Sequence, residues 1–143
     1  MTKKGIMYKI SRQLDFCYAH RLLGHQGKCR FLHGHHGRAR ITISAEKLNE
    51  MGMVMDFGDI RGTLEAWIDA ELDHRTILCR EDPLAAVLRE RGEPVVIFEE
   101  NPTAENLARF IYEKGREMGL PVTEVRVWET PKCSAIYGEL VSR

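Results

Sequence analysis

The sequence lacks any apolar run long enough for a secretory signal or a membrane span. We therefore expect a cytosolic protein with no membrane partner. An excess of charge is missing as well, because 21 Lys and Arg side chains balance 21 Asp and Glu side chains. The net charge therefore gives no reason to expect a nucleic-acid partner.

Internal repeats, low-complexity tracts and Gly/Ser-rich linkers are also absent. A chain of 143 residues can bury a core without disulfides, so we expect a single domain over residues 1–143. Cysteine is scarce, and without an export signal its side chains are expected to be free thiols. The four cysteines are Cys17, Cys29, Cys79 and Cys133.

Two segments alternate between apolar and polar residues, the pattern of a half-buried strand. One runs from Ile6 to Phe16 with its apolar side chains at even positions, and the other runs through Ala39, Ile41 and Ile43 at odd positions. Shorter strands are predicted at residues 94–98, 122–129 and 134–141.

Two helices are predicted from apolar residues spaced three and four apart. Asp56 can cap the first helix, which should end near Asp73 and His74, and Thr103 can cap the second, which should end at Gly119. The second helix is expected to turn five side chains toward the core: Ala104, Leu107, Phe110, Ile111 and Met118. A short helix within residues 82–92, capped by Asp82, is also predicted.

These elements predict an α+β domain in which a four-stranded antiparallel sheet carries two main helices on one face. Such a sheet has two open edges, which favour pairing with other subunits.

Three of the six histidines and one cysteine fall within the stretch CRFLHGHH, residues 29–36. In an extended segment His33 and His35 point to one side, the side of the apolar positions of the second strand. His20 shares the inward parity of the first strand, so pairing of the two strands would bring three imidazoles together. Three nitrogen ligands and no carboxylate suit zinc with an open fourth position. The alternative is that these histidines are polar surface residues, as we expect for His25 and His36.

Cys29 has two possible roles beside such a metal. It could be a fourth ligand that makes the zinc structural, or a nearby thiol that acts as base or nucleophile, and spacing alone does not separate them. Asp73 could orient His74 for proton transfer if the helix has ended there, although a histidine favoured by the helix dipole is the alternative. Glu129 shares the inward parity of its strand, so it needs a partner unless the strand runs into solvent there.

Six ordered motifs cover nearly the whole chain: FCYAH, CRFLHGHH, MVMDFGDIR, LDHRT, NPTAENLA and VRVWET. In this combination the sequence resembles the family of 6-pyruvoyl-tetrahydropterin and 6-carboxy-tetrahydropterin synthases. The three-residue gap between Cys29 and His33 is similar to the bacterial 6-carboxy-tetrahydropterin synthases of the queuosine pathway.

The resemblance implies the tunnelling fold, in which subunits join edge to edge into a β-barrel, usually as a homohexamer with active sites at subunit boundaries. It implies that Cys29 is the catalytic base rather than a ligand, that Asp73 and His74 form a proton relay, and that Glu129 anchors the pterin ring. The zinc ligands that it implies are His20, His33 and His35.

The implied substrate is 7,8-dihydroneopterin triphosphate, and the implied products are 6-carboxy-5,6,7,8-tetrahydropterin, acetaldehyde and triphosphate. Within the family, the alternative is a synthase that eliminates triphosphate and keeps the three-carbon side chain. From a different class, the alternative is a structural zinc or interaction module with Cys29 as fourth ligand. Candidate side chains for the triphosphate are Lys28, Arg30, Arg38 and Arg75.

The sequence departs from the family pattern on both strands next to the expected metal ligands. Two alanines usually precede the first histidine, but here the residues are Cys17, Tyr18 and Ala19. After HGH, where the family has a small polar residue and a tyrosine, this chain has His36 and Gly37.

Overall fold

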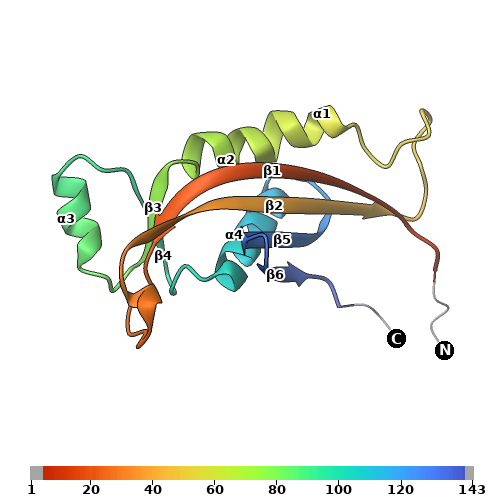
Figure 1. The fold of residues 1–143 in the computed structure, drawn as a ribbon. Helices are drawn as coiled ribbons and strands as arrows, with labels where there is room; N and C mark the ends of the chain where they lie inside the picture. The colour runs from red at the N-terminus through yellow and green to blue at the C-terminus, as the bar shows by residue number, and fades with distance from the viewer. Residues whose placement is uncertain (1–4, 141–143) are drawn as a thin grey trace.

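A computed structural model describes residues 5–140 of the chain. Its centre is a six-stranded mixed sheet in the order β4-β3-β1-β2-β5-β6 (Figure 1). The strands are β1 (Tyr8–His20), β2 (His33–Ala45), β3 (Arg75–Cys79), β4 (Val95–Phe98), β5 (Val122–Thr130) and β6 (Cys133–Gly138). Val141, the last residue of the final predicted strand, lies outside the described residues.

The long hairpin of β1 and β2 confirms the two predicted alternations. The strands pair antiparallel in one continuous register, from Tyr8 opposite Ala45 to His20 opposite His33. The even residues of β1 from Leu14 onward and the odd residues Ala39, Ile41 and Ile43 of β2 are buried. His20 lies inside β1 rather than just beyond its end, so the backbone ladder itself holds it.

The expectation of a four-stranded antiparallel sheet is wrong for the sheet as a whole. Strands β1, β2, β5 and β6 do pair antiparallel, but β3 pairs parallel to β1 and β4 pairs parallel to β3. The sequence of β3 shows no alternation because successive residues Ile77, Leu78 and Cys79 are all buried. Parallel strands covered on both faces have this pattern, which periodicity alone does not identify.

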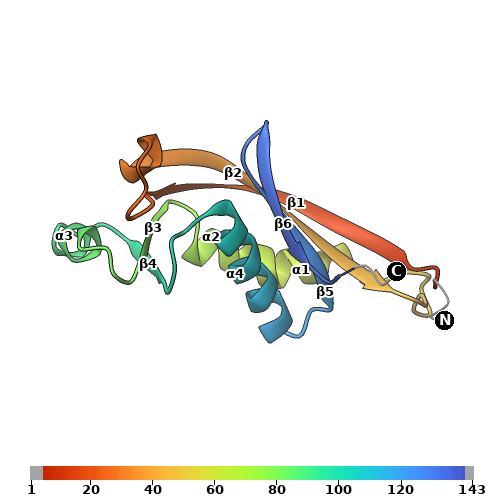
Figure 2. The ribbon, with the colours of Figure 1, turned by 90° about the horizontal axis from the view of Figure 1, so that it is seen from below.

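Both predicted long helices are present on one side of the sheet (Figure 2). The first consists of α1 (Phe57–Ile60), a π-helical turn η2 (Arg61–Glu65) and α2 (Ala66–Glu71). The Asp56 carboxylate caps it by accepting a 2.7 Å bond from the Gly58 N–H. Its core-facing residues are fully buried: Ile60, Leu64, Ile68 and Leu72.

The second long helix is α4 (Ala104–Glu117), and the Thr103 hydroxyl caps it by accepting from the Asn106 N–H at 3.1 Å. Leu107 and Ile111 are buried as predicted. Met118 is 37% exposed, contrary to expectation, because it follows the last helical turn. Gly119 ends the segment with a φ of 87°, a left-handed conformation that favours glycine.

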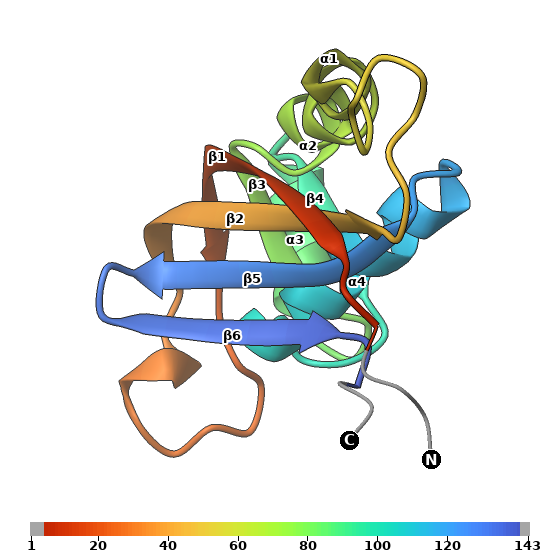
Figure 3. The same cartoon turned by 90° about the vertical axis from the view of Figure 1, so that its right-hand side faces the viewer.

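The helices and the inner face of the sheet share one apolar core. Viewed from the right-hand side of Figure 1, β2, β5 and β6 lie next to one another with β6 at the open edge (Figure 3). No helix within residues 5–140 is both long and apolar enough to cross a membrane.

The short predicted helix is α3 (Leu84–Glu90). Asp82 accepts a 2.9 Å bond from the Leu84 N–H at the start of this helix, but the N-cap position is held by Pro83 and not, as expected, by Asp82. The buried Asp82 carboxylate also accepts a 2.8 Å bond from Nε of Arg21, and Arg21 is the residue that follows His20. This ion pair therefore ties the end of β1 to the segment between β3 and β4.

We expect Asp82→Asn to lower the free energy of unfolding by about 2–3 kcal/mol at neutral pH, because it removes one partner of a largely buried pair. The Arg21 hydrogen bond lowers the pKa of Asp82, against the effect of burial. A lowered folded-state pKa stabilises the fold above the ordinary carboxyl value of about 3.9, and this stabilisation is lost as the pH falls through the folded-state pKa. Urea unfolding should therefore show a large difference between variant and wild type at pH 7 and a smaller one at pH 3.

The matched control is Glu99→Gln, which breaks the exposed pair between Glu99 and Arg80. Solvent screening makes such a pair weak, so this variant should unfold almost as wild type does. Equal effects of the two substitutions would show that the buried Asp82 pair stabilises the fold no more than the exposed Glu99 pair does.

Candidate metal centre and active site

Three imidazoles converge where β1 ends and β2 begins. His20 faces His33 across the ladder, and His35 lies two residues further along β2 on the same side. His20 Nε2 lies 3.1 Å from His33 Nε2 and 3.1 Å from His35 Nε2, and one ligand atom from each of the three residues lies within 4.8 Å of the other two. The strand parity of the sequence thus predicted this convergence correctly.

The hydrogen bonds of two of these rings fix which nitrogen is free. His20 Nδ1 lies 2.7 Å from the Pro102 carbonyl oxygen, and His33 Nδ1 lies 2.7 Å from the Phe31 carbonyl oxygen. A carbonyl only accepts, so each Nδ1 carries the proton and each Nε2 presents a lone pair.

Two lone pairs that face each other at 3.1 Å repel unless a cation lies between them. Tetrahedral metal–nitrogen bonds of about 2.0–2.1 Å place two ligand nitrogens about 3.3 Å apart, close to this spacing. Carbonyl acceptors on the far nitrogens are the usual outer partners of metal-bound histidines. The residues present therefore fit a metal ion bound by His20, His33 and His35.

Burial supports the same protonation state. It lowers the pKa of His20 to about 4, against a hydrogen bond to Pro102 that acts in the opposite direction. Burial also lowers the pKa of His35. Neutral imidazole is the form that binds metals, so these ligands are ready at neutral pH.

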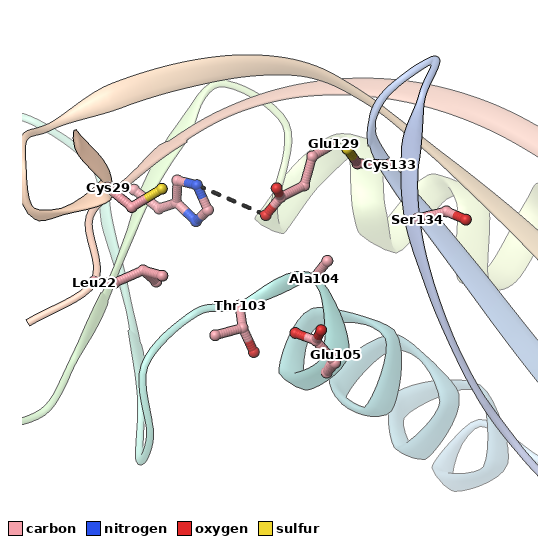
Figure 4. A pocket seen from close by; sticks show the side chains of 9 residues that line it. Leu22, Cys29, Thr103, Ala104, Glu105, Glu129, Cys133 and Ser134 are labelled. Carbon is pink, nitrogen blue, oxygen red and sulfur yellow. Dashed lines mark ion pairs between the residues drawn. The ribbon is translucent and has the colours of Figure 1, made fainter. Parts of the chain in front are cut away.

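A cavity of about 200 Å³ opens beside the imidazoles. Cys29 reaches it from the 3-10 turn η1 (Lys28–Arg30), and Glu129 reaches it from the end of β5. Glu129 Oε1 lies 3.9 Å from His20 Nε2, the pair joined by the dashed line in Figure 4. The sequence placed Cys29, Glu129 and the first histidine near one site, and the structure brings these three together.

Cys29 does not belong to the group of metal-ligand donors. Among residues 5–140, the only set of three or more candidate ligand atoms within 4.8 Å of one another is that of the three histidines. Glu129 is likewise outside this set, although it touches one of its members.

Asp73 and His74 form a pair, as predicted, but neither residue lines the cavity beside Cys29. Asp73 Oδ2 lies 2.8 Å from His74 Nδ1, and Asp73 Oδ1 accepts a 2.8 Å bond from the Cys17 N–H. Burial raises the pKa of Asp73, but these hydrogen bonds outweigh it and hold the pKa below its usual value. The helix has ended at Glu71, so these adjacent side chains can meet.

The His74 side chain is 78% exposed and lies in a second cavity of about 440 Å³, which Cys17, His36 and the candidate metal ligand His35 also line. Its φ of 59° is left-handed, a costly conformation for a residue with a side chain. Within one chain, therefore, the pair does not line the cavity that holds Cys29.

Other lining residues were not identified as site residues from the sequence. Thr103, Ala104 and Glu105 border the smaller cavity from the first turn of α4, and Cys133 and Ser134 border it from β6. From the sequence, Thr103 is expected only to cap the helix, and nothing in the periodicity indicates that this helix start faces a cavity.

None of the four candidate side chains for triphosphate lines the smaller cavity. Arg38 instead pairs with Asp15 at 2.9 Å, and Arg75 borders the larger cavity.

Comparison with known proteins settles the family. A model of the family described as 6-pyruvoyl tetrahydropterin synthase matches residues 9–139.

The chain belongs to the 6-pyruvoyl tetrahydropterin synthase family.

Relatives within the family carry a more specific name. A 6-carboxy-5,6,7,8-tetrahydropterin synthase of Rickettsia typhi is 40% identical over 136 residues, which cover 89% of this chain and 97% of that relative. The Haemophilus influenzae protein of the same name is 33% identical over 141 residues, which cover 93% and 100%.

Solved structures show the same fold. A protein of Wolinella succinogenes superposes with a TM-score of 0.78 at 26% identity, covering 95% of this chain and 100% of that one. The 6-pyruvoyl tetrahydropterin synthase of Caenorhabditis elegans superposes with a TM-score of 0.71 at 23% identity, covering 97% and 100%. The α+β family fold is thereby confirmed.

We expect the purified protein to bind about one divalent metal ion per chain, and His35→Ala to lose most of it. The lone pairs of the remaining two rings cannot hold the ion as tightly as three. Elemental analysis of dialysed protein measures the metal content. A chelator should lower the melting temperature of wild type but not that of His35→Ala.

His36→Ala is the matched control, because His36 is the neighbouring histidine and its side chain is 72% exposed. It should keep full metal content. Loss of metal from His36→Ala, or full retention by His35→Ala, would contradict the three-histidine site.

Proposed function

We propose that this protein is a zinc-dependent carbon–carbon lyase that converts 7,8-dihydroneopterin triphosphate and one water to 6-carboxy-5,6,7,8-tetrahydropterin, acetaldehyde and triphosphate. One observation carries the proposal: three imidazole nitrogens converge, and one of these rings, His20, lines a cavity together with the Cys29 thiol and the Glu129 carboxylate. The names of the 33–40% identical relatives support the specific reaction.

Zinc is the metal that three neutral nitrogens favour, and three protein ligands leave a fourth position for substrate. When bound, zinc supplies a Lewis acid that makes the protons near a coordinated hydroxyl more acidic.

Cys29 is proposed as the base that removes such a proton. Its sulfur lies outside the set of metal-ligand donors but borders the same cavity. This placement favours a catalytic thiol over a fourth ligand, and so favours an enzyme over a structural zinc module.

Glu129 is proposed to anchor the pterin ring. Its two oxygens can accept from the ring N–H and the adjacent amino group, a planar two-point contact. Glu129 lies near the end of β5, and within residues 5–140 it forms no ion pair with an arginine or a lysine. Its carboxylate is therefore available to a ligand of this kind.

Asp73 is proposed to hold His74 in the orientation needed for proton transfer. Because His74 borders a different cavity from Cys29, we propose that a neighbouring subunit supplies the pair to each site. Strand β6 has an open edge, with Ile136 and Tyr137 exposed by 54% and 37%, which supports edge-to-edge assembly into the homohexamer of the family.

Purified protein incubated with 7,8-dihydroneopterin triphosphate and magnesium should release acetaldehyde and a product with the mass of 6-carboxy-5,6,7,8-tetrahydropterin. Cys29→Ala should keep its metal and lose at least about 100-fold in turnover, as expected for a general base. A product that keeps the three-carbon side chain would show the synthase that eliminates triphosphate instead.

Cys79→Ala is the control, because it removes a buried thiol on β3 that does not line the cavity. It should keep turnover. Loss of both metal and folding in Cys29→Ala would support the structural zinc module.

His74→Gly separates catalysis from stability. It removes the imidazole but relieves the left-handed backbone of residue 74, which glycine adopts without strain. We expect turnover to fall by about 100-fold or more, while the free energy of unfolding stays within about 1 kcal/mol of wild type. Unfolding and turnover are measured on the same preparation, and an active His74→Gly protein would contradict the relay.

A further inference from the structure

The hydroxyl of Tyr18 is a buried donor without an acceptor. Tyr18 lies on β1 two residues before His20, and its side chain is on the core side with 3% exposure. Its hydroxyl oxygen is the one buried side-chain polar atom in the described part of the chain that has no hydrogen-bond partner. Leaving a buried hydroxyl unpaired is costly, so a partner is expected in the working state of the site.

The Glu129 carboxylate has the complementary deficiency. Its one ion-pair contact within residues 5–140 is His20 Nε2 at 3.9 Å. That nitrogen carries no proton, because His20 Nδ1 donates to the Pro102 carbonyl. The contact therefore supplies no hydrogen bond, and a carboxylate with about four acceptor positions is left without a donor from His20.

The sheet places these two groups in the same region. Arg38 of β2 pairs with Trp128 of β5, and the next residues of the two strands beyond this pair are Gly37 and Glu129. Glu129 lies at an irregularity of β5, where its pairing with β6 shifts register. The Tyr18 ring lies over Gly37, where an added Cβ would be 2.7 Å from the ring carbon Cε1. Tyr18 thus fills the space that a side chain at position 37 would take, on the side where Glu129 lies.

Contacts with the histidines place Tyr18 in the same neighbourhood. Its ring centre is 5.2 Å from that of His20 and 5.6 Å from that of His35. A tyrosine hydroxyl has an ordinary pKa of about 10, so at neutral pH it carries its proton and can donate.

We infer that Tyr18 is a positioning residue whose hydroxyl donates a hydrogen bond to the Glu129 carboxylate when a pterin is bound. The inference rests on the proposed role of Glu129 as the anchor of that ring. The hydrogen bond fixes the plane of the carboxylate from the buried side and leaves acceptor positions for the two ring donors. Tyr18 acts through Glu129, because its own hydroxyl is too buried to reach a ligand.

Tyr18→Phe tests this contact, because it removes the hydroxyl and keeps the ring. The dissociation constant of the fluorescent ligand 6-carboxypterin should rise about 10- to 150-fold, as should KM, the size of effect expected for one hydrogen bond to a charged group. The value of kcat should change less than about threefold, since a ring bound less often still reacts once bound. Metal content and melting temperature should not fall, because the variant loses an unpaired buried group.

Gly37→Ala tests the same hydroxyl independently, by displacing the Tyr18 ring. Its Cβ pushes the Tyr18 ring, so it should also weaken pterin binding. On the Tyr18→Phe background the same substitution should add little, because both changes act through one hydrogen bond. The matched controls are Tyr112→Phe and Gly62→Ala, which lie away from the cavity and should bind as wild type does.

Three results from the variants would overturn the inference. Tyr18→Phe could bind 6-carboxypterin within twofold of wild type, or it could lose metal in proportion to affinity, or the two substitutions could add fully. Wild-type protein that binds the pterin but releases no acetaldehyde would contradict the proposed reaction alone, while the Tyr18 effect on binding would still be measured. Wild-type protein that binds no pterin would overturn both.

Discussion

The pairing of β1 with β2 is the constraint on which the rest of the structure depends. Its register sets His20 opposite His33 and directs His35 to the same side. Side chains alternate between the two faces of a strand, so a slip of one residue would turn one set of rings away from the other. The apolar residues Leu14, Phe16 and Ile41 prevent such a slip, because it would move them from the core into water. The core and the metal centre are therefore specified by the same alternation.

That alternation explains why much of the fold, and the convergence of the three histidines, could be predicted from the sequence. Positions with period two gave β1 and β2, and capping residues such as Asp56 and Thr103 gave the helix starts. Strand β3 escaped prediction because it is buried on both faces and so carries no periodic signal. The separation of His74 from Cys29 also escaped prediction, since sequence motifs give the order of residues along the chain and say nothing of which cavity each one borders.

The polar groups of the site are held by two kinds of backbone, a regular strand pair and an irregular turn. The histidines sit on a continuous backbone ladder, which holds their nitrogens within one small volume. The Asp73 and His74 pair depends on a turn after α2, fixed by the bond from the His74 N–H to the Cys17 carbonyl at 2.7 Å. That turn imposes a left-handed conformation on His74, and strain of this kind persists where the surrounding structure enforces it. The regular part of the sheet thus places the metal ligands, and an irregular turn places the exposed imidazole.

The order of strands along the chain has a consequence for how the molecule reaches this structure. Only residues 21–32 separate β1 from β2 along the chain. Strand β3, which pairs with β1 from Tyr18 opposite Arg75 onward, follows in the chain only after the hairpin and the first helix. Closing a short loop takes less entropy than closing a long one, so the hairpin can form before the parallel strands join it. All three histidines belong to that hairpin. A chain in which only this hairpin has formed therefore already carries all three candidate metal ligands.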